Sequence, residues 1–137
     1  MRTAVLAATL LASTFVVPSS AVSQQRFVDY VPAPSAAAGA MWSDLYAVIP
    51  PGTNPDVFWR TARDADGRRI TATFFGAPVT CGPGTCPTRI FVDEDMVYDG
   101  MLCSVKGQHR LDVGAHVLQA CDETVRIDVP PASEDPS

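Results

Sequence analysis

The sequence predicts a mainly β fold: a small single-domain β-sandwich or barrel of short antiparallel strands, with one N-terminal helix and two disulfide bonds. Two observations predict this class. Short apolar runs recur roughly every 8–12 residues, and turn-forming dipeptides separate them. Four cysteines lie in the second half of the chain, and an even number of cysteines in an exported protein indicates disulfide bonds.

The first 23 residues have the order of a secretory signal peptide. Arg2 provides one positive charge, Ala4 to Val17 contains no charge, and small residues follow Pro18. The uncharged run is 14 residues long, whereas a transmembrane helix needs about 20. We expect residues 1–23 to be cleaved, leaving no membrane span; a retained anchor is the alternative. The mature protein is then expected to be periplasmic or secreted.

The rest of the chain is expected to contain an N-terminal arm (24–35), one β-rich domain (36–131) and a disordered acidic tail (132–137). Without Arg2 it holds nine basic and fifteen acidic residues, a formal charge of −6. Such a protein is repelled by nucleic acid and by anionic membranes, so neither is an expected partner. The excess of Arg over Lys, together with many Ala, Val and Pro, is typical of a GC-rich bacterial genome.

A helix is predicted over residues 36–48. Ser35 can cap its first N–H groups, and Pro50 ends it. Gly39 weakens the prediction by about 1 kcal/mol. The expected core-facing stripe contains Met41, Leu45 and Val48, with Trp42, Tyr46 and Ile49 beside it.

The clearest hairpin joins strands over 57–62 and 69–75 through the turn at 64–67. Val57, Trp59 and Thr61 are predicted on one face of its first strand, because side chains alternate along a strand. Residues 26–31 form an edge strand or a loose arm. The other predicted strands cover 89–92, 96–98, 101–105, 109–113, 117–121 and 124–129, with a turn at Asp99-Gly100.

The cysteines allow three pairings, of which we favour Cys81–Cys86 with Cys103–Cys121. Between the first two lies Gly82-Pro83-Gly84-Thr85, the signature of a type II turn, which brings its flanks within disulfide distance. We expect the second bond to tie two neighbouring strands. A zinc site or a redox motif is less favoured, because the spacing is C-x₄-C and no second close pair follows.

The two histidines are the candidate catalytic residues. Ser104, His109 and Asp112 would suit a hydrolase, and His109, His116 and Asp112 would suit a metal, but no G-x-S-x-G motif is present. The preferred interpretation is a solvent-facing strand histidine. We therefore assign no catalytic residue, no metal ligand and no cofactor.

Acidic turns offer two weaker cation hypotheses. Asp64, Asp66 and Gly67 resemble the start of a calcium loop, but the closing Glu is missing and two arginines follow. The Asp93-Glu94-Asp95 segment is interpreted as a solvated loop.

Four arginines are the candidate partner-binding residues: Arg60, Arg63, Arg68 and Arg69. They are predicted near one end of the hairpin, where guanidinium groups can pair with carboxylate or phosphate. The alternative is a solvated tip whose charges pair with Asp64 and Asp66.

The leading functional hypothesis is a small exported envelope protein that acts as a binding, inhibitor or accessory module, for an unknown envelope protein or an anionic ligand. The Cys81–Cys86 loop is a second candidate contact surface, because a closed loop loses little entropy on binding. The alternatives are a small secreted hydrolase that uses His109 or His116, and a structural component of an envelope assembly.

Overall fold

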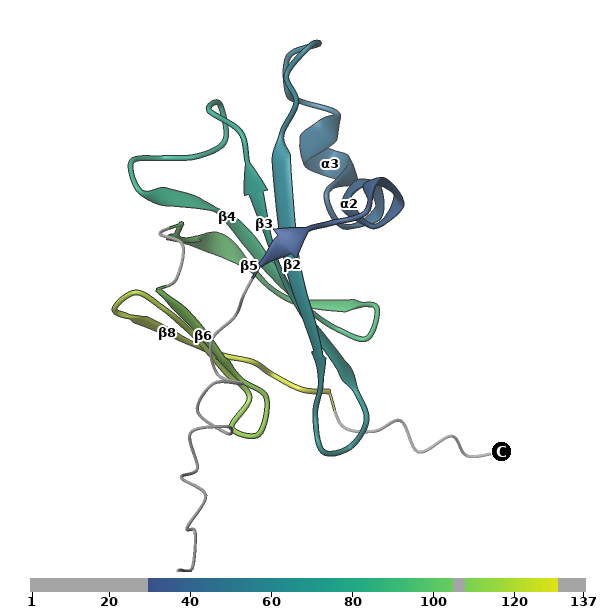
Figure 1. The fold of residues 1–137 in the computed structure, drawn as a ribbon, viewed down its shortest axis with the longest axis vertical. Helices are drawn as coiled ribbons and strands as arrows, with labels where there is room; N and C mark the ends of the chain where they lie inside the picture. The colour runs from purple at the N-terminus through teal and green to yellow at the C-terminus, as the bar shows by residue number, and fades with distance from the viewer. Residues whose placement is uncertain (1–29, 105–107, 131–137) are drawn as a thin grey trace, which may run out of the picture.

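The computed structural model describes residues 30–104 and 108–130. They form two antiparallel sheets and two short helices (Figure 1), which confirms the predicted mainly β fold. The expected signal peptide, residues 24–29 of the expected arm and the tail over 132–137 lie outside the described residues.

The elements follow one another as β1 (Val31–Pro32), α2 (Ser35–Met41), α3 (Ser43–Tyr46), β2 (Asp56–Arg63), β3 (Arg69–Gly76), β4 (Thr85–Val92), β5 (Asp95–Cys103), β6 (His109–Asp112), β7 (Val117–Ala120) and β8 (Glu123–Arg126). One sheet has the strand order β1-β2-β3-β4-β5 and the other β6-β7-β8. The β2–β3 hairpin is confirmed: Trp59 is opposite Thr73, Arg63 is opposite Arg69, and Gly67 takes a φ of 79° in the turn.

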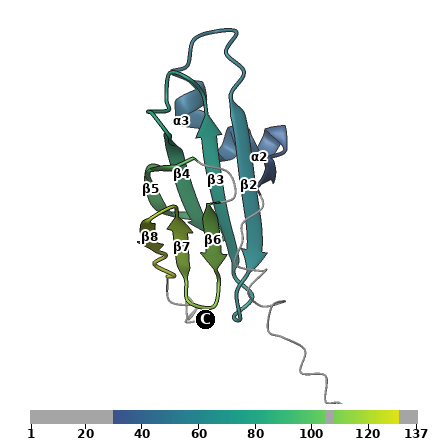
Figure 2. The ribbon, with the colours of Figure 1, turned by 60° about the vertical axis from the view of Figure 1, so that its left-hand side comes forward.

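The two covering layers lie on opposite faces of the five-stranded sheet and are offset along its strands (Figures 1 and 2). Strands β6–β8 bury Leu111 and Leu118 against the half of the sheet that contains Ile70, Ile90 and Val92. The helices bury Ala38 and Trp42 against the other half, at Val57, Phe75 and Ala77. Among the described residues, neither layer therefore covers the whole of its face.

The predicted helix over 36–48 is two short helices separated at Trp42, whose φ of −129° is not helical. The break lets the Trp42 ring become fully buried, and its indole Nε1 donates to Thr73 Oγ1 at 3.0 Å. The predicted cap at Ser35 is wrong, since α2 starts after Pro34 and has no side-chain cap bond. The predicted stripe is also partly wrong, because Val48 is 72% exposed.

The two strands predicted over 96–98 and 101–105 are one strand, β5, so the turn expected at Asp99-Gly100 is wrong. Both residues are paired with β4, Asp99 with Arg89 and Gly100 with Thr88. An Asp–Gly dipeptide favours a turn through its own backbone preferences, which contacts with other strands can outweigh. Here the Asp99–Arg89 ion pair at 3.2 Å stabilises the extended conformation.

Both predicted disulfides are present, Cys81–Cys86 and Cys103–Cys121. Gly84 takes a φ of 69°, as the predicted type II turn requires. The second bond does not tie two neighbouring strands. It joins the end of β5 to the turn between β7 and β8, and so links the two sheets.

Candidate binding site beside helix α2

Helix α2 is built almost entirely from small residues, and cavities lie along both of its sides. Its sequence is SAAAGAM, and side chains of this size cannot fill the space between a helix and a sheet. One cavity, of about 460 Å³, lies between Ala37, Ala40 and Met41 of α2 and the sheet. We call it the Arg69 groove; it is also lined by Trp59, Arg69, Thr71, Phe91, Asp93 and Glu94.

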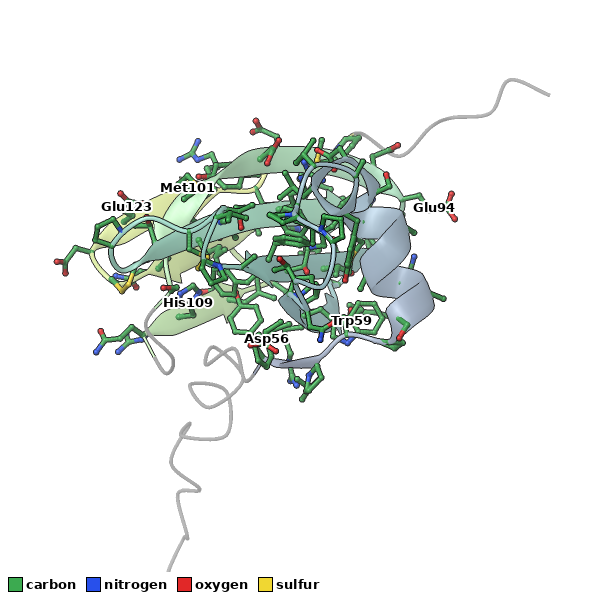
Figure 3. The ribbon with its side chains drawn as sticks, turned by 90° about the horizontal axis from the view of Figure 1, so that it is seen from above. Asp56, Trp59, Glu94, Met101, His109 and Glu123 are labelled. Carbon is green, nitrogen blue, oxygen red and sulfur yellow. A yellow bond between two sulfur atoms is a disulfide. The ribbon has the colours of Figure 1, made fainter. Side chains whose placement is uncertain are left out.

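The floor of the Arg69 groove is aromatic. Trp59 and Phe91 are both half-buried and lie on the helix side of the sheet; Figure 3 shows Trp59 beside the helices, with His109 on the opposite side. Thr71 is paired with Phe91 on β4 and is buried, and its Oγ1 lies 3.2 Å from Thr61 Oγ1. The alternation predicted for 57–62 places Trp59 on this face of the sheet. Alternation cannot indicate whether a helix covers Trp59 on that face.

The rim of the groove is charged. Arg63 and Arg69 are directly opposite each other at the end of the β2–β3 hairpin, and both are exposed. The Arg69 backbone N–H donates to Asp93 Oδ1 at 3.0 Å. The acidic turn between β4 and β5, which contains Asp93, therefore lies next to Arg69. Within the part of the chain that the structure describes, neither the Arg69 guanidinium nor the Glu94 carboxylate has a hydrogen-bond or ion-pair partner.

The four candidate arginines do not form one cluster. Only Arg63 and Arg69 share a face. Arg60 is opposite the buried Ala72 and therefore lies on the side of β6–β8. Arg68 donates to the backbone oxygen of Pro130, which holds the segment after β8 to the hairpin.

A polar cluster at Arg89 fixes the helices above the groove. Its guanidinium donates to both carboxylate oxygens of Asp44, at 2.8 and 2.6 Å, and to Met41 O and Asp99 Oδ1. It also lies 4.4 Å from the centre of the Trp42 ring. The bonds from Arg89 lower the pKa of Asp44 to about 2, and the same bonds raise the pKa of Arg89. The position of α2 is therefore set by a bidentate ion pair.

His109 is 2% exposed, so the prediction of a solvent-facing histidine is wrong. Its ring lies in an aromatic cluster with Phe74 and Tyr30, at centroid distances of 4.6 and 5.3 Å. Nε2 lies 2.6 Å from Cys103 O, which can only accept, so Nε2 carries the proton and Nδ1 accepts from the Tyr30 hydroxyl. Burial lowers the pKa of His109 and raises the pKa of Tyr30.

His116 forms a hydrogen bond with a buried carboxylate. Its Nε2 donates to Asp64 Oδ2 at 3.1 Å, and the side chains are 32% and 2% exposed respectively. Burial opposes ionisation of Asp64, but the bonds from His116 and from the amides of Arg68 and Asp66 outweigh burial, so the pKa of Asp64 is lowered. Both Asp64 oxygens already have protein partners, which leaves the calcium hypothesis without its first ligand.

A further cavity, of about 370 Å³, lies against the Cys81–Cys86 bridge. It is lined by Asp56, Phe58 and Phe74 of the hairpin and by Ser104 after β5. Phe58 is opposite Phe74, which belongs to the apolar cluster of the β6–β8 face, so this cavity lies on that face. Ser104 therefore lies at a surface cavity, whereas both ring nitrogens of His109 have other partners. The Ser104–His109–Asp112 hypothesis gains no support from this geometry.

No protein family, curated protein or solved structure matches this chain. Within residues 30–104 and 108–130, no helix has the length and hydrophobicity needed to cross a membrane. Over the same ranges, no three His, Cys, Asp or Glu side chains are grouped as metal ligands.

Proposed function

We propose that this protein is a small exported binding module, bacterial in origin and placed in the periplasm or outside the cell. Two disulfide bonds support export, because such bonds persist in oxidising compartments. The signal-like order of residues 1–23 is consistent with it. Edman sequencing of the purified native protein is expected to start after Ala21 or Ser23, and an intact Met1 would contradict export by cleavage.

The partner surface that we propose is the Arg69 groove, and its occupant is an acidic peptide segment of an envelope protein. One observation carries the proposal: a guanidinium without a partner among the described residues stands at the rim of a cavity with a Trp–Phe floor. Trp and Arg dominate the binding energy of protein interfaces. Arg63 adds a second cation directly opposite Arg69, so an acidic side chain meets both.

The neighbouring acidic turn gives the groove a direction. Asp93 and Glu94 follow Arg69 along the rim, so the charge changes from positive at the β2–β3 hairpin to negative at the β4–β5 turn. A segment that lies across the groove is favoured when its acidic residue meets Arg63 and Arg69 and an apolar residue covers Trp59.

A peptide library displayed on phage and selected on the folded protein tests this proposal. We expect enrichment of peptides that combine Asp or Glu with an aromatic or aliphatic residue, and loss of their binding in Arg63→Ser/Arg69→Ser. Arg60→Ser is the matched control, since Arg60 lies on the same hairpin but on the other face. Equal binding by the double variant and the control would refute the groove as the contact surface.

A second candidate function, hydrolysis, is favoured by the Asp64–His116 pair. A buried carboxylate that accepts from Nε2 leaves Nδ1 as the basic nitrogen of a ring that is 32% exposed. We expect His116→Gln to abolish any hydrolysis of p-nitrophenyl acetate above background, with His109→Gln as control. Wild-type protein without such activity would remove this candidate.

The third hypothesis, a structural role in an envelope assembly, would use the outer edge of β5. Among the described strands β5 has one neighbour, β4, and its Met96 and Met101 are 50% and 45% exposed. However, the β4–β5 pairing is shifted between Ile90 and Phe91, and β5 carries Asp95 and Asp99. Irregular pairing and charge discourage edge-to-edge pairing, so we do not propose this role.

A further inference from the structure

The last described residue, Pro130, lies at the β2–β3 hairpin, beside the Arg69 groove. Its backbone oxygen accepts a hydrogen bond from the Arg68 guanidinium. Figure 1 shows this stretch of chain in yellow, reaching the hairpin from the β6–β8 layer. Arg69 directly follows Arg68, and consecutive Cα atoms are only about 3.8 Å apart. The residues after Pro130 therefore begin next to the cationic rim of the groove.

The chain that follows Pro130 is acidic. Residues 131–137 have the sequence PASEDPS, which contains two carboxylates, Glu134 and Asp135, and no cation. They lie outside the described residues. Glu134 is four residues beyond Pro130, and four extended residues span up to about 13 Å. That length allows both carboxylates to reach a guanidinium on the strand that starts beside Arg68.

The hairpin end of the groove carries the complementary charge. Among the described residues, the Arg69 guanidinium has no hydrogen-bond or ion-pair partner. Arg63, directly opposite, uses Nη1 on the backbone oxygen of Gly67 at 2.8 Å, which leaves its other donors for a carboxylate. The acidic turn with Asp93 and Glu94 repels a second acidic segment, which confines such a segment to the hairpin end.

We propose that segment 131–137 occupies the hairpin end of the Arg69 groove, where Glu134 and Asp135 pair with Arg63 and Arg69. The inference rests on the proposed function, because it makes this segment an internal competitor of the acidic partner. A short connection gives an attached segment an effective concentration of roughly millimolar. The segment has no aromatic or long aliphatic residue, so a partner that also covers Trp59 gains contacts that the segment lacks and displaces it.

NMR of the ¹⁵N-labelled full chain tests the proposal without a partner. The variant Glu134→Gln/Asp135→Asn, which we call the neutral-segment variant, removes both charges and keeps the length of the segment. The side-chain Nε–H signals of Arg63 and Arg69 should differ between this variant and wild type. The difference should largely disappear in about 1 M NaCl, since salt screens exposed ion pairs.

The matched control is Asp122→Asn/Glu123→Gln. It removes the same number of charges from two exposed residues at the β7–β8 turn, and it should leave the signals of both arginines unchanged. Identical arginine signals in wild type and in the neutral-segment variant would overturn the proposal. Equal shifts in the control would also overturn it, because they would reflect net charge alone.

An added peptide measures the competition directly. The probe is an acetylated, amidated peptide with the sequence PASEDPS. It should bind the neutral-segment variant at least about threefold more tightly than wild type, since the attached segment of wild type competes for the same arginines. Equal affinity for the two proteins would refute occupation of the groove by the segment.

The phage-selected peptides separate this inference from the proposed function. If they require Arg63 and Arg69 while the neutral-segment variant behaves as wild type, the groove remains the partner surface and only its occupation by segment 131–137 is refuted. If they bind Arg63→Ser/Arg69→Ser as well as wild type, the groove is not the partner surface, and the proposed competition fails with it.

Discussion

On one face of the five-stranded sheet, β6–β8 complete a cluster of ten buried apolar residues, whereas the helices on the other face complete a cluster of only five. The first cover is tied to the sheet by Cys103–Cys121, and the second by the ion pair between Arg89 and Asp44. The better-packed face supplies stability. The helix face, whose cover is built from small residues, holds the groove that we propose as the partner surface.

The largest expected effect is on the β6–β8 face. Leu118→Ala should lower the free energy of unfolding by about 4 kcal/mol, because Leu118 is fully buried and its removal leaves a cavity. Met41→Ala on the helix face should cost about 1 kcal/mol or less, since Met41 is only half-buried at the Arg69 groove. Urea unfolding of both variants measures the difference, and equal costs would break the comparison.

The two disulfide bonds should also differ in how much they stabilise the protein, with the bond on the β6–β8 face contributing more. Replacing Cys103 and Cys121 by Ala should cost about 3 kcal/mol, because the bond closes the longer loop and links the two sheets. The Cys81/Cys86 double Ala variant should cost about 2 kcal/mol, since its loop spans a separation of 5 residues. Guanidinium chloride unfolding checks the ranking; a larger cost for Cys81–Cys86 would contradict it.

On the helix face, Arg89→Ala should cost about 2 kcal/mol. It removes a bidentate ion pair and the packing of the guanidinium on Trp42, but Asp44 and Asp99 are more than half exposed and regain water. Trp42 fluorescence, read in a Trp59→Phe background, should shift to the red as its cover loosens. Arg89→Lys should recover only part of the loss, because an ammonium cannot pair bidentately; full recovery would show that charge alone holds the helices.

The hairpin and both disulfides were predictable from the sequence because their signals are local. Asp66-Gly67 and Pro83-Gly84 specify turns by backbone conformation, and each places its own flanking residues. The turn expected at Asp99-Gly100 failed for the complementary reason. The conformation of Asp99-Gly100 is decided by the pairing of Asp99 with Arg89, ten residues away. The sequence of the dipeptide itself contains no information about that pairing.

The candidate site was only half predictable. Arg69 was singled out by charge, but Trp59 and Phe91 were interpreted as ordinary strand residues, since their exposure depends on how far α2 extends over the sheet. His109 was misassigned for the same reason: its burial arises from Tyr30 and Phe74, which lie far from it in sequence. Alternation identifies the face of a strand, whereas tertiary packing decides which face is covered.

The smallest expected effect is a pH dependence confined to the β6–β8 face. Burial lowers the pKa of His109 below its ordinary 6.5, so the unfolded chain takes up a proton at a higher pH than the folded protein does. Stability from this group is therefore complete above about pH 7 and falls as the pH drops through 6.5 towards 5.5. Urea unfolding at both pH values should show this loss in wild type and in His116→Gln, but not in His109→Gln. If the loss disappeared in His116→Gln instead, the titrating group would lie at the β2–β3 hairpin, where His116 bonds Asp64. Acid sensitivity would then not arise from the buried His109. The proposed difference in acid sensitivity between the two faces of the sheet would be wrong.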